Sequence, residues 1–144
     1  GAKISQPNKK SLYGPEVADQ MNNISITGLK KRSDYLKTSS ARLKSVTPGL
    51  ILQGRNHTPN EIRSNNLSDL RIGFTVSKKV GNAVSRNRVK RRLKAVAQNI
   101  LLTKSPKHLD LVVIGRQNAL KRSFSNLLAD MEKALTQIQI SKRN

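Results

Sequence analysis

The sequence predicts an α+β fold, an α/β sandwich in which helices pack on a small mixed sheet. Residues 70–77 alternate apolar and polar side chains with the period of two that is typical of a strand. Residues 82–105 contain neither Gly nor Pro and repeat apolar side chains with helical period. The apolar segment 109–115 follows, so the chain contains a strand–helix–strand unit.

The remaining elements extend this unit on both sides. Pro48 and Gly49 indicate a turn before a strand, Asn82 is a plausible N-cap, and Pro106 ends the long helical segment. The polar residues 54–69 are predicted to form a long loop. The expected order is a helix within 29–43, a strand at 50–53, a strand at 70–77, a helix within 82–105, a strand at 109–115 and an amphipathic helix at 119–140.

The domain boundary follows a change in composition. Residues 1–27 mix Ser, Asn, Gln, Gly and Pro with little periodicity, which predicts a flexible N-terminal arm. Residues 28–141 are predicted to form one folded domain, a size ordinary for a single core.

Charge dominates the composition. The chain has 28 Lys and Arg against 8 Asp and Glu, a net charge of +20, which favours a polyanionic partner. An anionic membrane is a weaker second candidate, because no apolar run approaches the roughly 18 residues of a spanning helix. Without an apolar signal segment, we expect a cytoplasmic protein. The absence of Cys excludes disulfides and thiolate metal sites.

The positive charge is concentrated in one segment. No acid lies between Asp69 and Asp110, and eight Lys and Arg lie between Lys78 and Lys94. Like charges one helical turn apart cost about 0.2–0.5 kcal/mol a pair, and cations near a helix N-terminus oppose the helix dipole. A bound phosphate reverses both effects. On a helical projection, the side opposite the apolar stripe carries Arg88, Lys90, Arg91, Arg92 and Lys94.

The same segment carries a family resemblance. Residues 77–93, SKKVGNAVSRNRVKRRL, resemble the signature of the bacterial ribonuclease P protein, whose centre is the triplet Arg86-Asn87-Arg88. The segment LKKRSDY at 29–35 is similar to that family's first helix. Residues 70–77 and DLVVIGR at 110–116 look like the strands before and after the signature. The likeness covers roughly residues 28–138.

The resemblance implies a fold and a function. The signature helix would make a left-handed crossover between parallel strands, against the usual right-handed rule. The chain would be a subunit of a ribonucleoprotein endonuclease that removes the 5′ leader of precursor tRNA. The RNA subunit would perform the hydrolysis with Mg²⁺ that it holds itself, and the protein would bind no metal tightly. The implied partners are ribonuclease P RNA and precursor tRNA, with one protein per holoenzyme and no membrane.

The resemblance also implies which residues meet RNA. Nine would face the catalytic RNA: Lys78, Lys79, Asn82, Arg86, Asn87, Arg88, Lys90, Arg91 and Lys94. Four would line a cleft for the leader: Tyr35, Ile51, Gln53 and Thr75. Ser39 stands where relatives often carry a second aromatic, so leader binding is expected to be more polar here, since each stacked base contributes about 1–3 kcal/mol.

No side chain is predicted to be catalytic. His57 lies in the polar segment, Asp34, Asp69 and Asp110 are far apart in sequence, and no metal-ligand spacing occurs. His108-Leu109-Asp110 is interpreted as polarity at the start of a strand.

Two other functions remain open. A ribosomal-type protein that only scaffolds rRNA would carry a similar basic helix. A DNA-binding module is disfavoured because no helix-turn-helix pair or dimerisation heptads are present.

Overall fold

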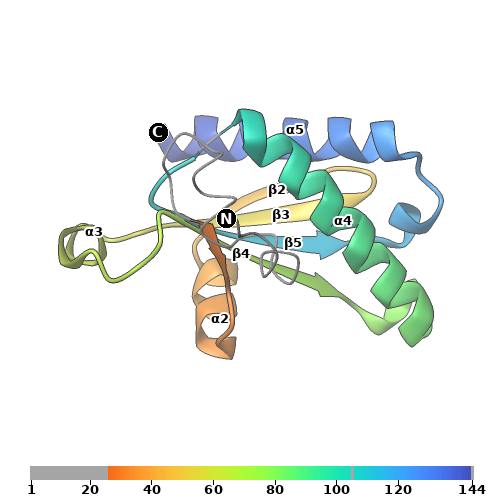
Figure 1. Cartoon of the computed structure of the whole chain (residues 1–144), viewed down its shortest axis with the longest axis horizontal. Coiled ribbons are helices and arrows are strands. Elements are labelled where there is room, and N and C mark those ends of the chain that lie inside the picture. The colour runs from red at the N-terminus through yellow and green to blue at the C-terminus, as the bar shows by residue number, and fades with distance from the viewer. Residues whose placement is uncertain (1–25, 105, 144) are drawn as a thin grey trace, which may run out of the picture.

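The structure, a computed structural model, describes residues 26–104 and 106–143 (Figure 1). Most of the N-terminal arm expected at residues 1–27 lies outside these residues, but Ile26 and Thr27 belong to the first strand. The elements are β1 (Ile26–Gly28), α2 (Arg32–Ser40), β2 (Leu43–Val46), β3 (Leu50–Asn56), α3 (Pro59–Ser64), β4 (Leu70–Val76), the 3-10 helix η2 (Lys78–Val80), α4 (Ala83–Thr103), β5 (Leu109–Gly115), the 3-10 helix η3 (Gln117–Leu120) and α5 (Phe124–Arg143).

One mixed sheet forms the centre of the fold, in the strand order β1-β4-β5-β3-β2. β4 and β5 are adjacent and parallel, and α4 connects them, as the strand–helix–strand prediction required. β1 is parallel to β4, whereas β3 is antiparallel to β5 and β2 to β3. The α+β fold with a mixed sheet is confirmed, and the left hand of the crossover stays a prediction.

The helices cover the two faces of the sheet unequally. α4 and α5 lie together on one face, and α2 lies on the other (Figure 1). Alternation along β5 sends the buried Leu109, Leu111 and Val113 toward α4 and α5. Gly115 continues this row, where a Cβ would lie 2.6 Å from the Val89 side chain of α4. The main core therefore lies between the sheet and these two helices.

Helix α4 forms as the sequence predicts. The Asn82 side chain accepts a hydrogen bond from the Ser85 backbone N–H at 2.9 Å, which caps the helix. The apolar stripe is buried over its whole length, at Val89, Leu93, Val96, Ala97 and Ile100. No helix in the described part of the chain is long and apolar enough to cross a membrane.

Three predictions of local structure were wrong. The helix expected within 29–43 ends at Ser40, and Leu43 begins the edge strand β2, because Arg42 turns the chain with a positive φ of 69°. The segment 54–69 is not all loop, since β3 continues to Asn56 and α3 follows. Helix α5 begins at Phe124, after η3, and not at residue 119.

The sequence contained a signal for α3 that the prediction of a loop at 54–69 overlooked. Thr58 and Glu61 form a reciprocal capping box, with Pro59 at the first helical position. The sequence Thr-Pro-Asn-Glu matches that motif, so this short helix was predictable from its cap.

Candidate RNA-binding surface

The nine residues predicted to meet the catalytic RNA lie together at one end of the molecule. Lys78 and Lys79 belong to η2, Asn82 caps α4, and the other six lie within the first twelve residues of α4. Seven of the nine side chains are exposed, and Arg86 and Lys90 are half-buried. We call these nine residues, Lys78, Lys79, Asn82, Arg86, Asn87, Arg88, Lys90, Arg91 and Lys94, the basic surface.

The turn that leads into α4 holds this surface in place. Gly81 has a φ of 152°, and a Cβ there would lie 3.0 Å from Ser85, so glycine is the residue that fits. Arg86 donates a hydrogen bond from Nη1 to the Gly81 carbonyl at 2.8 Å, which closes the turn across the helix start. The first turn of α4 contains no acidic residue.

The cations of the basic surface have no acidic partners in the described chain, where the ion pairs involve other residues. Their mutual repulsion and the helix dipole are therefore uncompensated within residues 26–104 and 106–143. Phosphate groups would supply the missing negative charge, so this geometry favours a nucleic-acid backbone.

Arg92 differs from its neighbours, because its guanidinium is bonded within the protein. Its placement among the exposed cations of α4 was therefore wrong. Its Nη1 donates to the Ala119 carbonyl and its Nη2 to the Arg122 carbonyl, each at 2.6 Å. The guanidinium therefore holds the segment between β5 and α5 against α4. Arg92 is a structural residue, although the helical projection placed it with the exposed cations.

The four residues predicted to line the leader cleft also lie together, on the sheet face that α2 covers. Strand register aligns the side chains of this face in rows across β3, β5 and β4. One row is Ile51–Ile114–Thr75 and the next is Gln53–Val112–Gly73. We call the α2-side residues of these three strands the α2 face.

Tyr35 reaches this face from α2. Its ring lies directly over Gly73, where any Cβ would overlap the Tyr35 ring and hydroxyl. The hydroxyl donates a hydrogen bond to the Leu29 carbonyl at 3.3 Å, and burial raises the pKa of Tyr35. Glycine at position 73 thus allows the only aromatic side chain of α2 to lie against the sheet.

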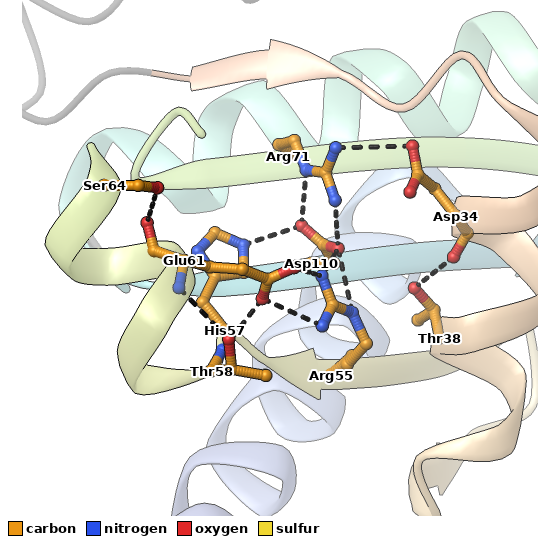
Figure 2. Close-up of polar contacts among 9 residues, drawn as sticks. All are labelled: Asp34, Thr38, Arg55, His57, Thr58, Glu61, Ser64, Arg71 and Asp110. Atoms are coloured by element: carbon orange, nitrogen blue, oxygen red, sulfur yellow. Dashed lines mark hydrogen bonds and ion pairs between the residues drawn. The ribbon is translucent and has the colours of Figure 1, made fainter. Parts of the chain in front are cut away.

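The third row of the α2 face is Arg55–Asp110–Arg71, and it contains a buried charge network (Figure 2). Arg71 donates from Nε to Asp110 Oδ1 at 2.8 Å and from Nη2 to Oδ2 at 2.7 Å. Arg55 donates from Nε and Nη2 to Oδ2 at 3.2 and 2.9 Å. His57 Nε2 lies 2.8 Å from Oδ1. The fully buried Asp110 carboxylate thus has three partners.

Two further carboxylates complete the network at its rim. Glu61 of α3 receives hydrogen bonds from Arg55 at 3.1 and 3.3 Å, and Asp34 of α2 receives one from Arg71 at 3.3 Å. The network therefore joins α2, α3 and three strands (Figure 2).

The network fixes the protonation state of Asp110. Burial alone would raise the pKa of this carboxyl, but hydrogen bonds from His57, Arg71 and Arg55 and the charge of Arg71 hold it well below its ordinary value. Asp110 is therefore ionised, and both arginines depend on it. Removal of one partner from such a buried pair typically costs about 3–5 kcal/mol.

Sequence reasoning missed this network. His57 lies in the short connection between β3 and α3, and Asp110 is the second residue of β5, but both are buried and bonded to each other. A signal was present, because Arg71 and Thr75 share one face of β4 by alternation and Asp110 interrupts an apolar strand. What the sequence does not show is the pairing of β5 with both β3 and β4.

The carboxylates beside the α2 face are engaged in the charge network. Asp34, Glu61 and Asp110 are all bound by arginines, and the described part of the chain contains no group of three metal-ligating side chains.

Comparisons with known proteins identify the fold and the family. The family model described as Ribonuclease P matches residues 26–139. The ribonuclease P protein component of Paramagnetospirillum magneticum is 44% identical over 110 residues, which cover 76% of this chain and 80% of the relative. That of Ruegeria pomeroyi is 40% identical over 118 residues, 81% of this chain and 90% of the relative.

Solved structures agree. The RNase P protein of Staphylococcus aureus superposes with a TM-score of 0.61 and 24% identity over 76% of this chain and 92% of that chain. The RNase P protein from Thermotoga maritima gives a TM-score of 0.60 and 22% identity over 76% and 94%. At these identities the structures support the fold, and the closer sequence relatives support a role in ribonuclease P and tRNA processing. The chain belongs to the ribonuclease P protein family.

Proposed function

We propose that this protein is the ribonuclease P subunit that binds the catalytic RNA through its basic surface and the 5′ leader of precursor tRNA across its α2 face. One observation carries this proposal. Strand β4 runs along the α2 face and leads through Ser77 directly into η2 and the basic surface. An RNA strand on the α2 face would therefore pass from Thr75 onto Lys78 and Lys79 without leaving the protein.

The protein residues bind and orient, while the RNA subunit performs the chemistry. Mg²⁺ held by the RNA would supply the activated water and stabilise the leaving oxygen of the phosphodiester. The basic surface would neutralise RNA phosphates near that centre, and the α2 face would fix the position of the leader. We place this reaction in the cytoplasm with one protein per holoenzyme.

The α2 face suits a single strand held mainly by polar contacts. Tyr35 offers one aromatic ring, Gln53 and Thr75 offer hydrogen-bonding groups, and Ile51 and Ile114 are partly exposed. Ser39, at the position where an aromatic was expected in relatives, donates to the Leu36 carbonyl at 3.0 Å. Leader affinity should therefore depend less on base stacking than in a cleft with two aromatic rings.

The proposal is tested by reconstitution with a ribonuclease P RNA. We expect the protein to lower the Mg²⁺ concentration needed for cleavage of leader-bearing precursor tRNA, and the protein alone to cleave nothing. Cleavage by the protein without RNA would contradict the assignment of chemistry to the RNA.

Crosslinking separates this function from rRNA scaffolding. A photoreactive group at position 75, introduced by Thr75→Cys because the natural chain has no cysteine, should crosslink to the 5′ leader. Crosslinks to rRNA and none to the leader would favour the ribosomal-type function.

A further inference from the structure

A pocket of about 550 Å³ lies at the far end of the α2 face, between α2 and α3. Leu36, Lys37 and Ser40 line it from α2, and Arg55, Thr58 and Glu61 line it from the opposite side. None of these residues belongs to the four predicted for the leader cleft or to the basic surface. One wall of the pocket is formed by α3 and its cap, in the segment that the sequence predicted to be a loop.

The α3 wall of this pocket is rigidly held. Thr58 donates from its backbone N–H to Glu61 at 2.8 Å, and its hydroxyl accepts from the Glu61 N–H at 3.1 Å. Glu61 in turn accepts two hydrogen bonds from Arg55 of β3. A ligand would therefore meet a preformed site and would not have to order a loop.

The chemistry of the lining suits one nucleotide. Arg55 lines the pocket, and its Nε, Nη1 and Nη2 atoms all donate to carboxylates, so a base in the pocket would contact this guanidinium by stacking rather than by hydrogen bonds. The apolar Leu36 side chain is 53% exposed. Lys37 adds an exposed cation within reach of a phosphate.

The position of the pocket indicates which part of the 5′ leader could reach it. β4 points toward the basic surface, and α3 lies at the opposite end of the sheet (Figure 1). The third row of the α2 face, Arg55–Asp110–Arg71, connects the pocket to the rows that contain Gln53 and Thr75. A leader that runs from the basic surface along this face reaches the pocket with its upstream part.

We propose that the α2–α3 pocket binds one nucleotide of the 5′ leader, upstream of those on the α2 face, with its base against Leu36 and Arg55 and its phosphate at Lys37. This inference rests on the proposed function. It gives the protein a second specificity determinant, one that short leaders do not reach.

The test uses holoenzyme reconstituted from the full chain and precursor tRNAs whose leaders are shortened one nucleotide at a time. The wild-type affinity should rise in a step at the length that first reaches the pocket. Leu36→Ala should abolish this step, a loss of about five- to tenfold for longer leaders, and leave shorter leaders unaffected. Lys37→Ala should reduce the same step and its salt dependence.

Val46→Ala is the matched control, because Val46 is equally exposed at 52% but lies on the edge strand β2. It should leave the affinity unchanged at every leader length. Identical length profiles for wild type and Leu36→Ala, or an equal loss at all lengths, would overturn the pocket inference alone. If the affinity of the wild-type holoenzyme for precursor tRNA did not depend on the presence or length of the leader, the proposed leader-binding function would be overturned as well.

Discussion

Arginines serve opposite purposes in two regions of this protein. In the charge network, Arg55 and Arg71 are nearly buried, with 11% and 13% of their side chains exposed, and share the carboxylate of Asp110. On the basic surface, Arg88 and Arg91 are exposed and have no acidic partner among the described residues. The comparison teaches that the pairing of a cation, and not its presence, decides whether it stabilises the fold or remains available to RNA.

Two neighbouring arginines of one helix show the same difference between a paired and an unpaired cation. Arg91 and Arg92 are consecutive in α4, yet only Arg92 binds backbone carbonyls of the η3 segment. A count of basic residues would assign both to RNA.

The largest effect is expected in the network. Asp110→Asn leaves two nearly buried guanidinia without their shared anion and should lower the free energy of unfolding by about 3–5 kcal/mol, measured by urea denaturation. Glu132→Gln is the control, because the Lys104–Glu132 pair is exposed at 3.9 Å and should contribute less than about 1 kcal/mol. A loss for Asp110→Asn as small as that of the control would contradict the structural role of the network.

Acid should weaken the same network. The pKa of Asp110 is lower in the folded protein than in the unfolded chain, so its contribution is fully present above an unfolded-state pKa near about 4 and is lost as the pH falls below it. Glu61, whose pKa is also lowered, acts in the same direction. The free energy of unfolding should therefore decline below about pH 4.

The Asp110→Asn variant provides the comparison for this pH dependence. Its unfolding free energy should change less than that of the wild type between neutral and acid pH, since it lacks the main titrating group. Parallel curves for the two proteins would show that other carboxyls cause the acid sensitivity.

An intermediate effect is expected for Arg92→Ala. The loss of hydrogen bonds from a charged donor to the Ala119 and Arg122 carbonyls should cost about 1.5–3 kcal/mol of stability. The dependence of RNA affinity on salt should stay that of the wild type. A thermal unfolding scan and a salt titration of RNA binding measure the two quantities on one sample.

The smallest effect on stability, and the clearest on RNA, is expected for the adjacent Arg91→Ala. Stability should change by less than about 0.5 kcal/mol. The slope of log affinity against log salt should become shallower by about 0.7–0.9 if one phosphate contact is lost. Lys133→Ala, an exposed cation on α5, is the matched control and should leave the slope unchanged. An unchanged slope for Arg91→Ala would place its guanidinium in solvent.

Local pattern and cap chemistry predicted most of the fold. The alternation of β4, the stripe of α4 and the Asn82 cap all formed as expected, because each depends on residues within one or two turns of chain. The capping box of α3 was equally local and was overlooked. The edge strand β2 was not predictable in this way, since its four residues depend on pairing with β3.

The sequence by itself determined the α+β class, the concentration of cations at the start of α4 and, through the signature around Asn87, the family. Tertiary structure alone decided which cations are paired. Arg55, Arg71 and Asp110 are brought into one row by the pairing of β3, β5 and β4, and Arg92 meets η3 across the helix layer. These contacts join residues 27 to 55 positions apart, and periodicity reports only near neighbours in the chain.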